Sequence, residues 1–329
     1  MAKCLITGCG GFLGSHLADF LCDRGFDVYG LIYGDARNIE HLKDRITILE
    51  CDIRDKHRVE DVVLKVKPGY VFHFAAQSLV VPSWQDPEKT FNTNILGTFY
   101  LLDAIRGANI DPIIEVACSS AEYGLNYEHE IPVTETKEFR PLSPYGVSKV
   151  GTDMLCYLYW QAYGMKIVRT RPFNITGPRK RLDACSDFSQ GIAAIENGLK
   201  GDLELGNLDA VRDITDYRDG IKAIWLLAER GKPGDVYNIC SGKGYKMREV
   251  LEKLISLAKK PIRFRQIPDK MRPLDDPIFI GDNSKLRSLG WEPEIPLERT
   301  LADILDYWRI EIQQDIKPEV PSPRSSNKL

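Results

Sequence analysis

The chain has 329 residues, of which 43% are hydrophobic and 28% charged, and its formal net charge is −3. This length suffices for one large domain or two smaller ones. No long basic block or basic amphipathic helix occurs, which argues against nucleic acids and membrane surfaces as partners. No apolar run approaches the ~20 residues of a membrane helix, and no signal-peptide pattern precedes the first strand. We therefore expect a cytoplasmic protein.

The cysteines and histidines show no metal-binding spacing. The eight cysteines form no C-x-x-C pair, and the five histidines form no H-x-x-x-H pair. Several cysteines lie within apolar strands, so we expect reduced, buried thiols and no metal centre.

The first predicted element is a buried strand over residues 4–7, and a glycine turn follows it. Gly8, Gly11 and Gly14 stand in this turn, before a helical pattern over residues 16–21. Such a turn lets the backbone approach a pyrophosphate, which the N–H groups at the helix N-terminus then face. The G-x-x-G-x-x-G spacing predicts dinucleotide binding; the alternative is a tight turn without a ligand.

Strands and helices alternate along the first half of the chain. Strands are predicted at 27–33, 46–50, 70–74, 113–117 and 166–171, and helices at 57–66, 93–107 and 144–163. This order predicts an α/β fold with a Rossmann-type doubly wound parallel sheet. Ligands bind at the carboxyl ends of such strands, where Asp52, the segment 75–78 and the segment 118–120 stand.

The alternation weakens after about residue 175, where Gly and Pro become frequent and basic residues cluster. We interpret this part as a smaller C-terminal substrate-binding domain. The expected boundaries are 1–174 for the NAD(P)-binding domain, with a returning segment at about 213–242; 175–212 and 243–313 for the substrate-binding domain; and 314–329 for a disordered Pro/Ser-rich tail.

A tyrosine and a lysine open the helix predicted at 144–163. Tyr145 and Lys149 are spaced i, i+4 and so share one helical face. A phenol has a reference pKa near 10, and a fixed ammonium beside it favours the phenolate needed for acid–base work at neutral pH. We predict that both residues are catalytic; the alternative is a surface tyrosine and a solvated lysine.

Several motifs together resemble the extended short-chain dehydrogenase/reductase superfamily of nucleotide-sugar enzymes over nearly the whole chain. They are TGCGGFLGS, AAQS, SSAEYG, SPYGVSK and RPFNITGP. The segments GNLDAVRDITDYRD, GDVYNICSG and RPLDDP are most similar to the branch of GDP-mannose 4,6-dehydratases and GDP-6-deoxy-4-ketomannose reductases.

The resemblance implies roles for individual residues. Ser119 would bind the sugar C4 oxygen beside Tyr145. The expected cofactor-binding residues are Gly8, Gly11, Phe12, Leu13, Gly14, Arg37, Asp52, Ile53, Ala75, Ala76, Gln77, Tyr145 and Lys149. The expected substrate-binding residues are Ser120, Asn174, Arg179, Asn207, Arg212, Arg272 and Asp275. Asn174 also matches a cofactor position of the family, and the segment after Gly177 departs from the family's nucleotide-binding pattern.

The cofactor is expected to be NADP or NAD. An acid at the end of the second strand favours NAD and an arginine favours NADP. This chain has both Asp35 and Arg37 there, and we favour NADP.

One position separates a reductase from a dehydratase. The dehydratases of this family place a glutamate base two residues after the hydroxyl residue, where this chain has Ala121. Glu122 is one residue off, and in an extended segment a one-residue shift reverses the side chain's direction. We therefore expect an NAD(P)H-dependent reduction of a nucleotide-diphosphate 4-keto-6-deoxy sugar, with a GDP-sugar favoured. The alternatives are a dehydratase with Glu122 realigned as base, a 4-epimerase, and a non-catalytic NAD(P)-binding protein.

The two long helices, 93–108 and 144–163, carry more apolar residues than one buried face requires. In the superfamily the corresponding pair forms a four-helix dimer interface, so the resemblance implies a homodimer.

Overall fold

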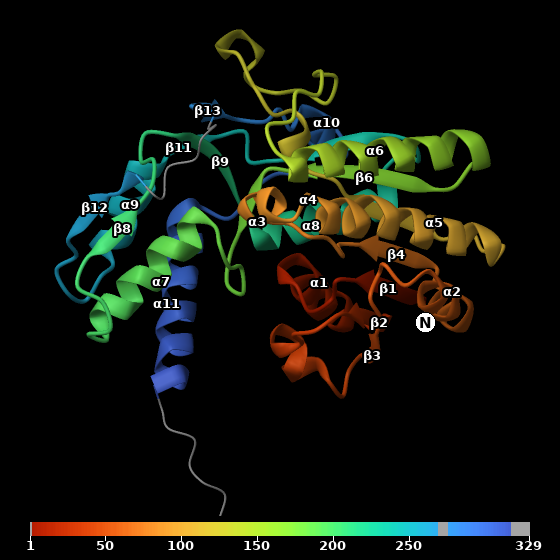
Figure 1. Ribbon diagram of the computed structural model, residues 1–329, viewed down its shortest axis with the longest axis horizontal. Coiled ribbons are helices and arrows are strands. Elements are labelled where there is room, and N and C mark those ends of the chain that lie inside the picture. Colours follow the sequence, from red (N-terminus) through yellow and green to blue (C-terminus); the bar gives the residue numbers. More distant parts are fainter. Residues whose placement is uncertain (1, 269–275, 317–329) are drawn as a thin grey trace, which may run out of the picture.

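The computed structural model describes residues 2–268 and 276–316. A large sheet with helices on both faces forms one part of the molecule, and a smaller lobe built around α7 and α11 lies beside it (Figure 1).

Seven parallel strands form the main sheet in the order β10-β6-β5-β4-β1-β2-β3. Their bounds are β1 Lys3–Thr7, β2 Asp27–Ile32, β3 Thr47–Glu50, β4 Tyr70–His73, β5 Ile113–Ala117, β6 Ile167–Pro172 and β10 Val236–Ile239. The order reverses between β1 and β4, whose last paired residues are Thr7 and His73. Such a reversal opens a crevice at the carboxyl ends of the two strands, where ligands bind in this kind of sheet. The sequence-based prediction of a Rossmann-type fold is thus confirmed.

Helices cover both faces of this sheet because each carries an apolar stripe. One apolar core joins α1 (Phe12–Cys22) and α8 (Tyr217–Arg230) to one face. A second core joins α2 (Lys56–Val66), α5 (Gly97–Gly107) and α6 (Pro144–Tyr163) to the other. Shorter helical segments are η1 Arg37–Leu42, α3 Val80–Gln85, α4 Pro87–Phe91, η2 Asn92–Leu96, η3 Ser120–Glu122, η4 Glu128–Glu130 and α10 Ser284–Arg287.

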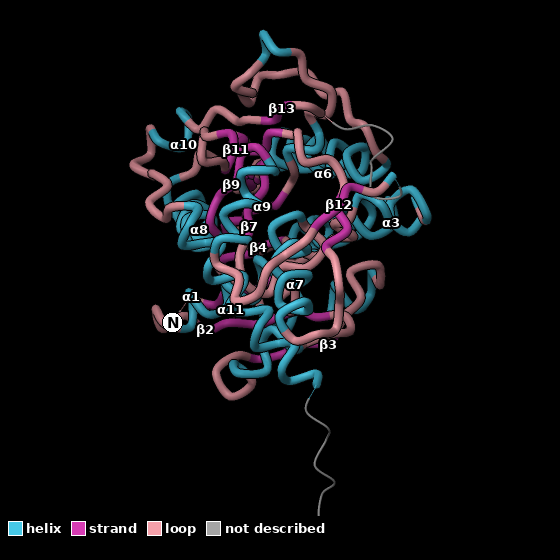
Figure 2. The backbone as a smooth tube through the Cα atoms, turned by 90° about the vertical axis from the view of Figure 1, so that its left-hand side faces the viewer, coloured by secondary structure: helices cyan, strands magenta, loops and turns pink. Residues whose placement is uncertain are grey.

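The smaller lobe has its own apolar core, formed by α7 (Ala184–Glu196), α9 (Met247–Ser256) and α11 (Leu297–Ile316). Figure 2 views the molecule from the side of this lobe, with α7 and α11 in front of the main sheet. Its strands are β7 Asn174–Thr176, β8 Leu203–Leu205, β9 Val211–Asp216, β11 Gly244–Lys246, β12 Phe264–Gln266 and β13 Ile278–Phe279. β7 directly follows β6 and pairs with β9, so the chain changes sheets at Phe173.

Three expected elements differ from the structure. The first helix begins at Phe12 instead of His16, with Gly11 as its N-cap. The helix expected over 93–107 is divided into a π-helical turn, η2, and the α-helix α5. The tail expected to begin at 314 is helical up to Ile316, and residues 317–329 lie outside the described residues.

Candidate active site

The glycine turn joins β1 to α1 in a conformation that excludes larger residues. Gly8 has φ +69°, and a Cβ on it would lie 2.8 Å from Ala75 N. A Cβ on Gly14 would overlap with Gly8 O. The turn is therefore packed tightly against both α1 and the segment after β4. The first-turn N–H groups of Phe12, Leu13 and Gly14 have no partner within the helix, which provides the donors that a pyrophosphate requires.

A charged pair follows β2 near this turn. Arg37 donates from its backbone N and from Nε to Asp35, at 2.9 and 2.8 Å, and this lowers the pKa of Asp35. The Arg37 side chain is 69% exposed. The neighbouring Asn38 donates to Gly10 O at 3.0 Å and ties this segment to the glycine turn.

Asp52 and Ile53 follow β3 at the same edge of the sheet. Arg54 Nη2 approaches Asp52 to 2.6 Å, and hydrogen bonds from Arg54 lower the pKa of Asp52. Ile53 is buried and limits the space around Gly97, where a Cβ would lie 2.8 Å from Ile53 Cγ2. Of these two residues, which were both expected to bind the cofactor, Asp52 is the one that is partly exposed.

A buried chain of polar side chains supports the segment after β4. Thr7 Oγ1 lies 2.7 Å from His73 Nδ1, and His73 Nε2 lies 2.9 Å from Thr98 Oγ1. Burial, aided by the nearby Lys149, lowers the pKa of His73 to about 3, so its ring is neutral at working pH. Ala75 N donates to the same Thr7 hydroxyl at 3.1 Å.

Asn94 connects this segment to α6, and sequence reasoning missed it. Its side chain accepts from Gln77 N at 2.8 Å and donates to Gln77 O at 3.0 Å and to Ser148 Oγ at 2.8 Å. Ser148 Oγ in turn donates to Tyr145 O. Asn94 lies in the π-helical turn η2, a feature that often occurs at functional sites. The sequence contains one signal for this contact, namely polar residues at positions 94 and 98 within an otherwise apolar helical pattern.

Ser119 caps a short 3-10 turn directly after β5. Its Oγ accepts from Ala121 N at 3.1 Å, while Glu122 Oε1 accepts from Ser119 N at 2.7 Å. This reciprocal arrangement is a capping box. Ser120 is also buried, whereas Ala121 is partly exposed.

Tyr145 and Lys149 lie near the N-terminus of α6, which begins with Ser143 as N-cap and Pro144 at its first position. Lys149 is 6% exposed, and its Nζ donates to Ala117 O at 2.7 Å. A Cβ on Gly146 would lie 2.7 Å from Ala121 O, so α6 packs directly on the turn that holds Ser119. The structure thus brings α6 and the carboxyl end of β5 together, as the resemblance requires.

Glu122 does not extend toward the open side of this turn. It is 0% exposed, and its Oε2 lies 3.1 Å from Arg171 Nε. Burial, and then the Asp153 carboxylate, raise the pKa of Glu122, while Arg171 opposes the rise. Cys118, Glu122 and Asp153 have ligand atoms within 4.8 Å of one another, but Arg171 already pairs with both carboxylates.

The expected substrate residues are more scattered. Asn174 donates to Asp213 O at 3.1 Å, and Arg212 donates to Asp276 O at 2.7 Å. Asn207 is exposed and accepts from Asp209 N.

Arg179 extends toward the main sheet: its Nη1 pairs with Asp19 of α1 at 2.7 Å. Arg272 and Asp275 lie outside the described residues.

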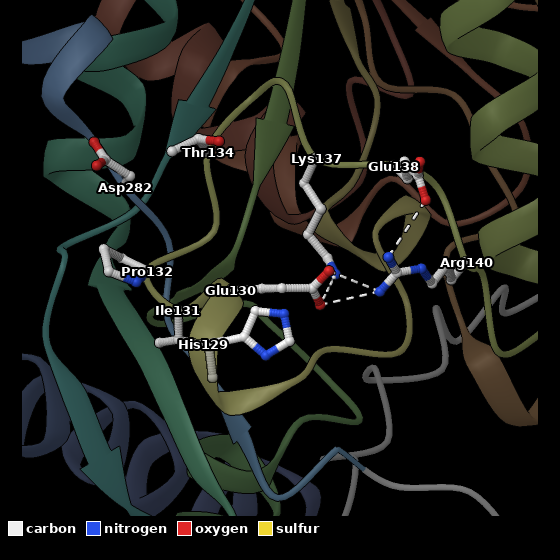
Figure 3. Close-up of a pocket in the computed structure, with 9 residues that line it drawn as sticks. All are labelled: His129, Glu130, Ile131, Pro132, Thr134, Lys137, Glu138, Arg140 and Asp282. Atoms are coloured by element: carbon white, nitrogen blue, oxygen red, sulfur yellow. Dashed lines mark hydrogen bonds and ion pairs between the residues drawn. The ribbon is translucent and has the colours of Figure 1, made fainter.

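A separate hollow of about 650 Å³ is lined by residues of η4 and of the loop that follows it, together with Asp282 (Figure 3). Its polar groups pair largely with one another: Glu130 accepts from Lys137 at 2.6 Å and from Arg140 at 2.8 Å. None of the described catalytic or cofactor residues predicted from the sequence lines it.

The fold defines a protein of the Rossmann type, and the known proteins that it resembles are NAD(P)-dependent enzymes of nucleotide sugars. The model of one protein family, described as GDP-mannose 4,6 dehydratase, matches residues 5–304. The chain is 30% identical to the GDP-6-deoxy-D-mannose reductase of Pseudomonas aeruginosa, over 95% of this chain and 99% of that protein. It is also 30% identical to the GDP-mannose 4,6-dehydratase of Vibrio cholerae, over 92% of each. The structure of RMD from Pseudomonas aeruginosa complexed with NADPH superimposes with a TM-score of 0.83 at 28% identity, covering 94% of this chain and 100% of that one.

The chain therefore belongs to the GDP-mannose 4,6 dehydratase family, and it is an NAD(P)-dependent enzyme. No helix in the described part of the chain is long and apolar enough to cross a membrane.

Proposed function

We propose that this protein reduces the C4 carbonyl of a nucleotide-diphosphate 4-keto-6-deoxy sugar of the GDP-4-keto-6-deoxymannose type. The reductase and dehydratase relatives are equally similar in identity, so overall similarity does not choose between the two reactions.

The proposal rests on the environment of the Glu122 side chain. Ala121 occupies the position of the dehydratase base, and its methyl group cannot accept a proton. The adjacent Glu122 is 0% exposed, and its two oxygens contact Ser119 N and Arg171 Nε. A base for elimination must reach a proton of the substrate within about 3 Å. A carboxylate held beneath the turn cannot do so without breaking both contacts.

The remaining residues suffice for a reduction. NAD(P)H, when bound, supplies the hydride. Tyr145 donates the proton to the C4 oxygen, the Ser119 hydroxyl hydrogen-bonds that oxygen, and the Lys149 ammonium favours release of the phenolic proton. The hydrogen bond of Lys149 Nζ to Ala117 O, at the end of β5, supports this role.

The cofactor is proposed to lie across the crevice between β1 and β4. Its pyrophosphate would contact the first-turn N–H groups of α1, and the nicotinamide end would reach Tyr145 and Lys149. The exposed Arg37 guanidinium would bind a 2′-phosphate, which favours NADP.

The nucleotide diphosphate is proposed to bind between the main sheet and the smaller lobe. Arg212 supplies a guanidinium on β9, and Asn174 lies on the strand paired with it. Arg179 is a weaker candidate because it pairs with Asp19. A GDP-sugar is favoured, since both relatives named above are named for GDP-sugars.

We also propose that the protein is a cytoplasmic homodimer that pairs through η2–α5 and α6. Met154, Tyr157 and Leu158 of α6 and Leu96 of η2 are exposed apolar residues. Light scattering should give twice the chain mass for the wild type and the monomer mass for Leu158→Glu; a monomeric wild type would refute the dimer.

Two incubations test the reaction. One contains GDP-mannose alone, and the other contains its 4-keto-6-deoxy product with NADPH, with reduced nicotinamide followed by absorbance and sugars by mass. We expect stoichiometric NADPH loss with the keto sugar and no reaction of GDP-mannose. Loss of water from GDP-mannose without net NADPH consumption would instead establish a dehydratase.

A further inference from the structure

Ser119 is held in place by two hydrogen bonds within a single short turn at the end of β5. Its backbone N–H donates to Glu122 Oε1 at 2.7 Å, and its Oγ accepts from Ala121 N at 3.1 Å. The orientation of the Ser119 hydroxyl therefore depends on where the Glu122 carboxylate sits.

The Glu122 carboxylate is itself held by a buried ionic array. Arg171 of β6 pairs with Glu122 at 3.1 Å and with Asp153 at 3.0 Å. Asp153 also pairs with Arg169. The side chains of all four residues are at most 7% exposed, and their two carboxylates face two guanidinium groups.

Asp153 connects the array to the proton-transfer residues. Tyr145, Lys149 and Asp153 are spaced i, i+4 and i+8 on α6 and so lie along one helical face. Three salt-bridge or hydrogen-bond steps thus lead from the Ser119 amide to the helix that carries Tyr145. The two halves of the catalytic set lie on different elements, the turn after β5 and the helix α6, and this array connects them.

We propose that Glu122 is a positioning residue, which acts with Arg171 and Asp153 to fix the Ser119 hydroxyl relative to Tyr145 and Lys149. The kinetic consequences rest on the proposed reductase function, whereas the ordering of Ser119 does not. Stability alone is a poor explanation of the array, because a buried ion pair is often no more stabilising than packed apolar residues. Catalytic groups must be held within about 0.5 Å of their productive positions, and a buried ionic array can supply this support.

Glu122→Gln is the informative variant. The Glu122 side chain accepts a hydrogen bond from Ser119 N at Oε1 and forms an ion pair with Arg171 at Oε2, whereas an amide accepts only at its oxygen and donates from its nitrogen. Whichever way the amide is oriented, the substituted side chain loses its contact with either Ser119 N or Arg171. We expect kcat to fall on the order of 10- to 100-fold, with KM and the Kd of NADPH changed much less, because the loss is one of alignment. The matched control is Glu196→Gln in the smaller lobe, where the Glu196 side chain is 7% exposed and pairs with Arg309 at 2.7 Å. It should lose stability but retain kcat.

A double-mutant cycle with Ser119→Ala separates positioning from general stability. If Glu122 acts through Ser119, the Gln substitution has little further effect on kcat once the hydroxyl is removed. Full additivity of the two effects would overturn the proposal. Tyr123→Phe provides a milder second variant, since it removes the Tyr123 hydroxyl that lies 3.0 Å from Arg171 Nη1 and leaves all four charges in place. It should lower kcat in the same direction and be coupled to Ser119→Ala; an unchanged kcat in both Glu122→Gln and Tyr123→Phe would refute the role.

Hydrogen–deuterium exchange supplies a readout that needs no substrate. The peptide containing Ser119 should exchange faster in Glu122→Gln than in the wild type or in Glu196→Gln, because the amide loses or weakens its acceptor. If the wild type reduces no keto sugar, the proposed function fails, but faster exchange at Ser119 still supports the positioning role. Unchanged exchange would refute that role irrespective of the reaction.

Discussion

Lys149 Nζ donates a 2.7 Å hydrogen bond to the carbonyl oxygen of Ala117, two residues before Ser119. This bond ties the helix that carries Tyr145 to the end of β5, the strand that precedes Ser119. A residue placed in this way contributes its charge and also fixes the distance between two elements. Removal of the tyrosine hydroxyl, which leaves this bond intact, is therefore a clean test of the chemistry.

Tyr145→Phe should reduce kcat for the keto sugar by roughly 10²- to 10⁴-fold, since the proton donor is lost. The Kd of NADPH, measured by fluorescence titration, should change by less than about tenfold, because at most one hydrogen bond is removed. Tyr163→Phe, at the exposed C-terminal end of the same helix, is the control and should retain full activity. Full biological function of Tyr145→Phe would instead favour the non-catalytic NAD(P)-binding alternative.

Gly14→Ala should abolish tight NADPH binding and destabilise the fold by about 1–3 kcal/mol, because its Cβ would overlap with Gly8 O and displace the turn. Calorimetric titration with NADPH and urea unfolding measure the two effects. Gly107→Ala is the matched control, since nothing lies within 4 Å of its added Cβ. Unchanged NADPH affinity in Gly14→Ala would show that the dinucleotide does not bind at this turn.

Glu115 should make stability fall as pH rises. It is completely buried on β5, an interior strand of the main sheet, and burial raises its pKa from 4.5 to about 8. Between these two pH values the folded protein keeps the Glu115 proton, whereas the unfolded chain has released it. The contribution of Glu115 to the free energy of unfolding is therefore complete below pH 4.5 and is lost as the pH rises to about 8. Glu115→Gln cannot lose a proton, and its stability relative to the wild type should increase across this window.

The measurement is urea unfolding of both proteins at several pH values between about 5 and 8. Glu298→Gln is the control, because hydrogen bonding to Lys253 lowers the pKa of that exposed carboxyl. Its stability difference from the wild type should be flat over this range. An equally flat difference for Glu115→Gln would contradict the assignment of a buried neutral acid.

Arg37→Ser should weaken NADPH binding by about tenfold or more while changing NADH binding little, because only NADPH carries the 2′-phosphate. Titration of both cofactors gives the ratio of their affinities. Arg45→Ser is a suitable control: it is another exposed arginine paired with an aspartate, Asp23, at 2.8 Å. An unchanged ratio in Arg37→Ser would show that Arg37 does not bind the 2′-phosphate.

The main sheet could be predicted from the sequence because its strands are short apolar runs separated by glycine turns and amphipathic helices. The π-helical turn at Asn94 could not, because its extra residue per turn is set by the polar contacts of Asn94 with Gln77 and Ser148. These partners are far away in sequence.

The sequence predicts which residues form the candidate site better than it predicts the direction of their side chains. The motif placed Ser119 correctly after β5, yet residue 122 lies in a 3-10 turn and not in the extended segment expected. Its inward direction results from Arg171, which comes from another strand. Likewise, no local pattern indicates that Arg179 pairs with Asp19 of α1.

The return of the chain to the main sheet has a consequence for biosynthesis. β10 pairs with β6, and α8 packs against the same sheet, but both are encoded after the crossing into the smaller lobe. A nascent chain that ends near residue 175 would carry an unpaired β6 edge and an uncovered apolar face, which invites edge-to-edge association. The nucleotide-binding sheet can therefore be completed on the ribosome only after about residue 240 has emerged from the exit tunnel.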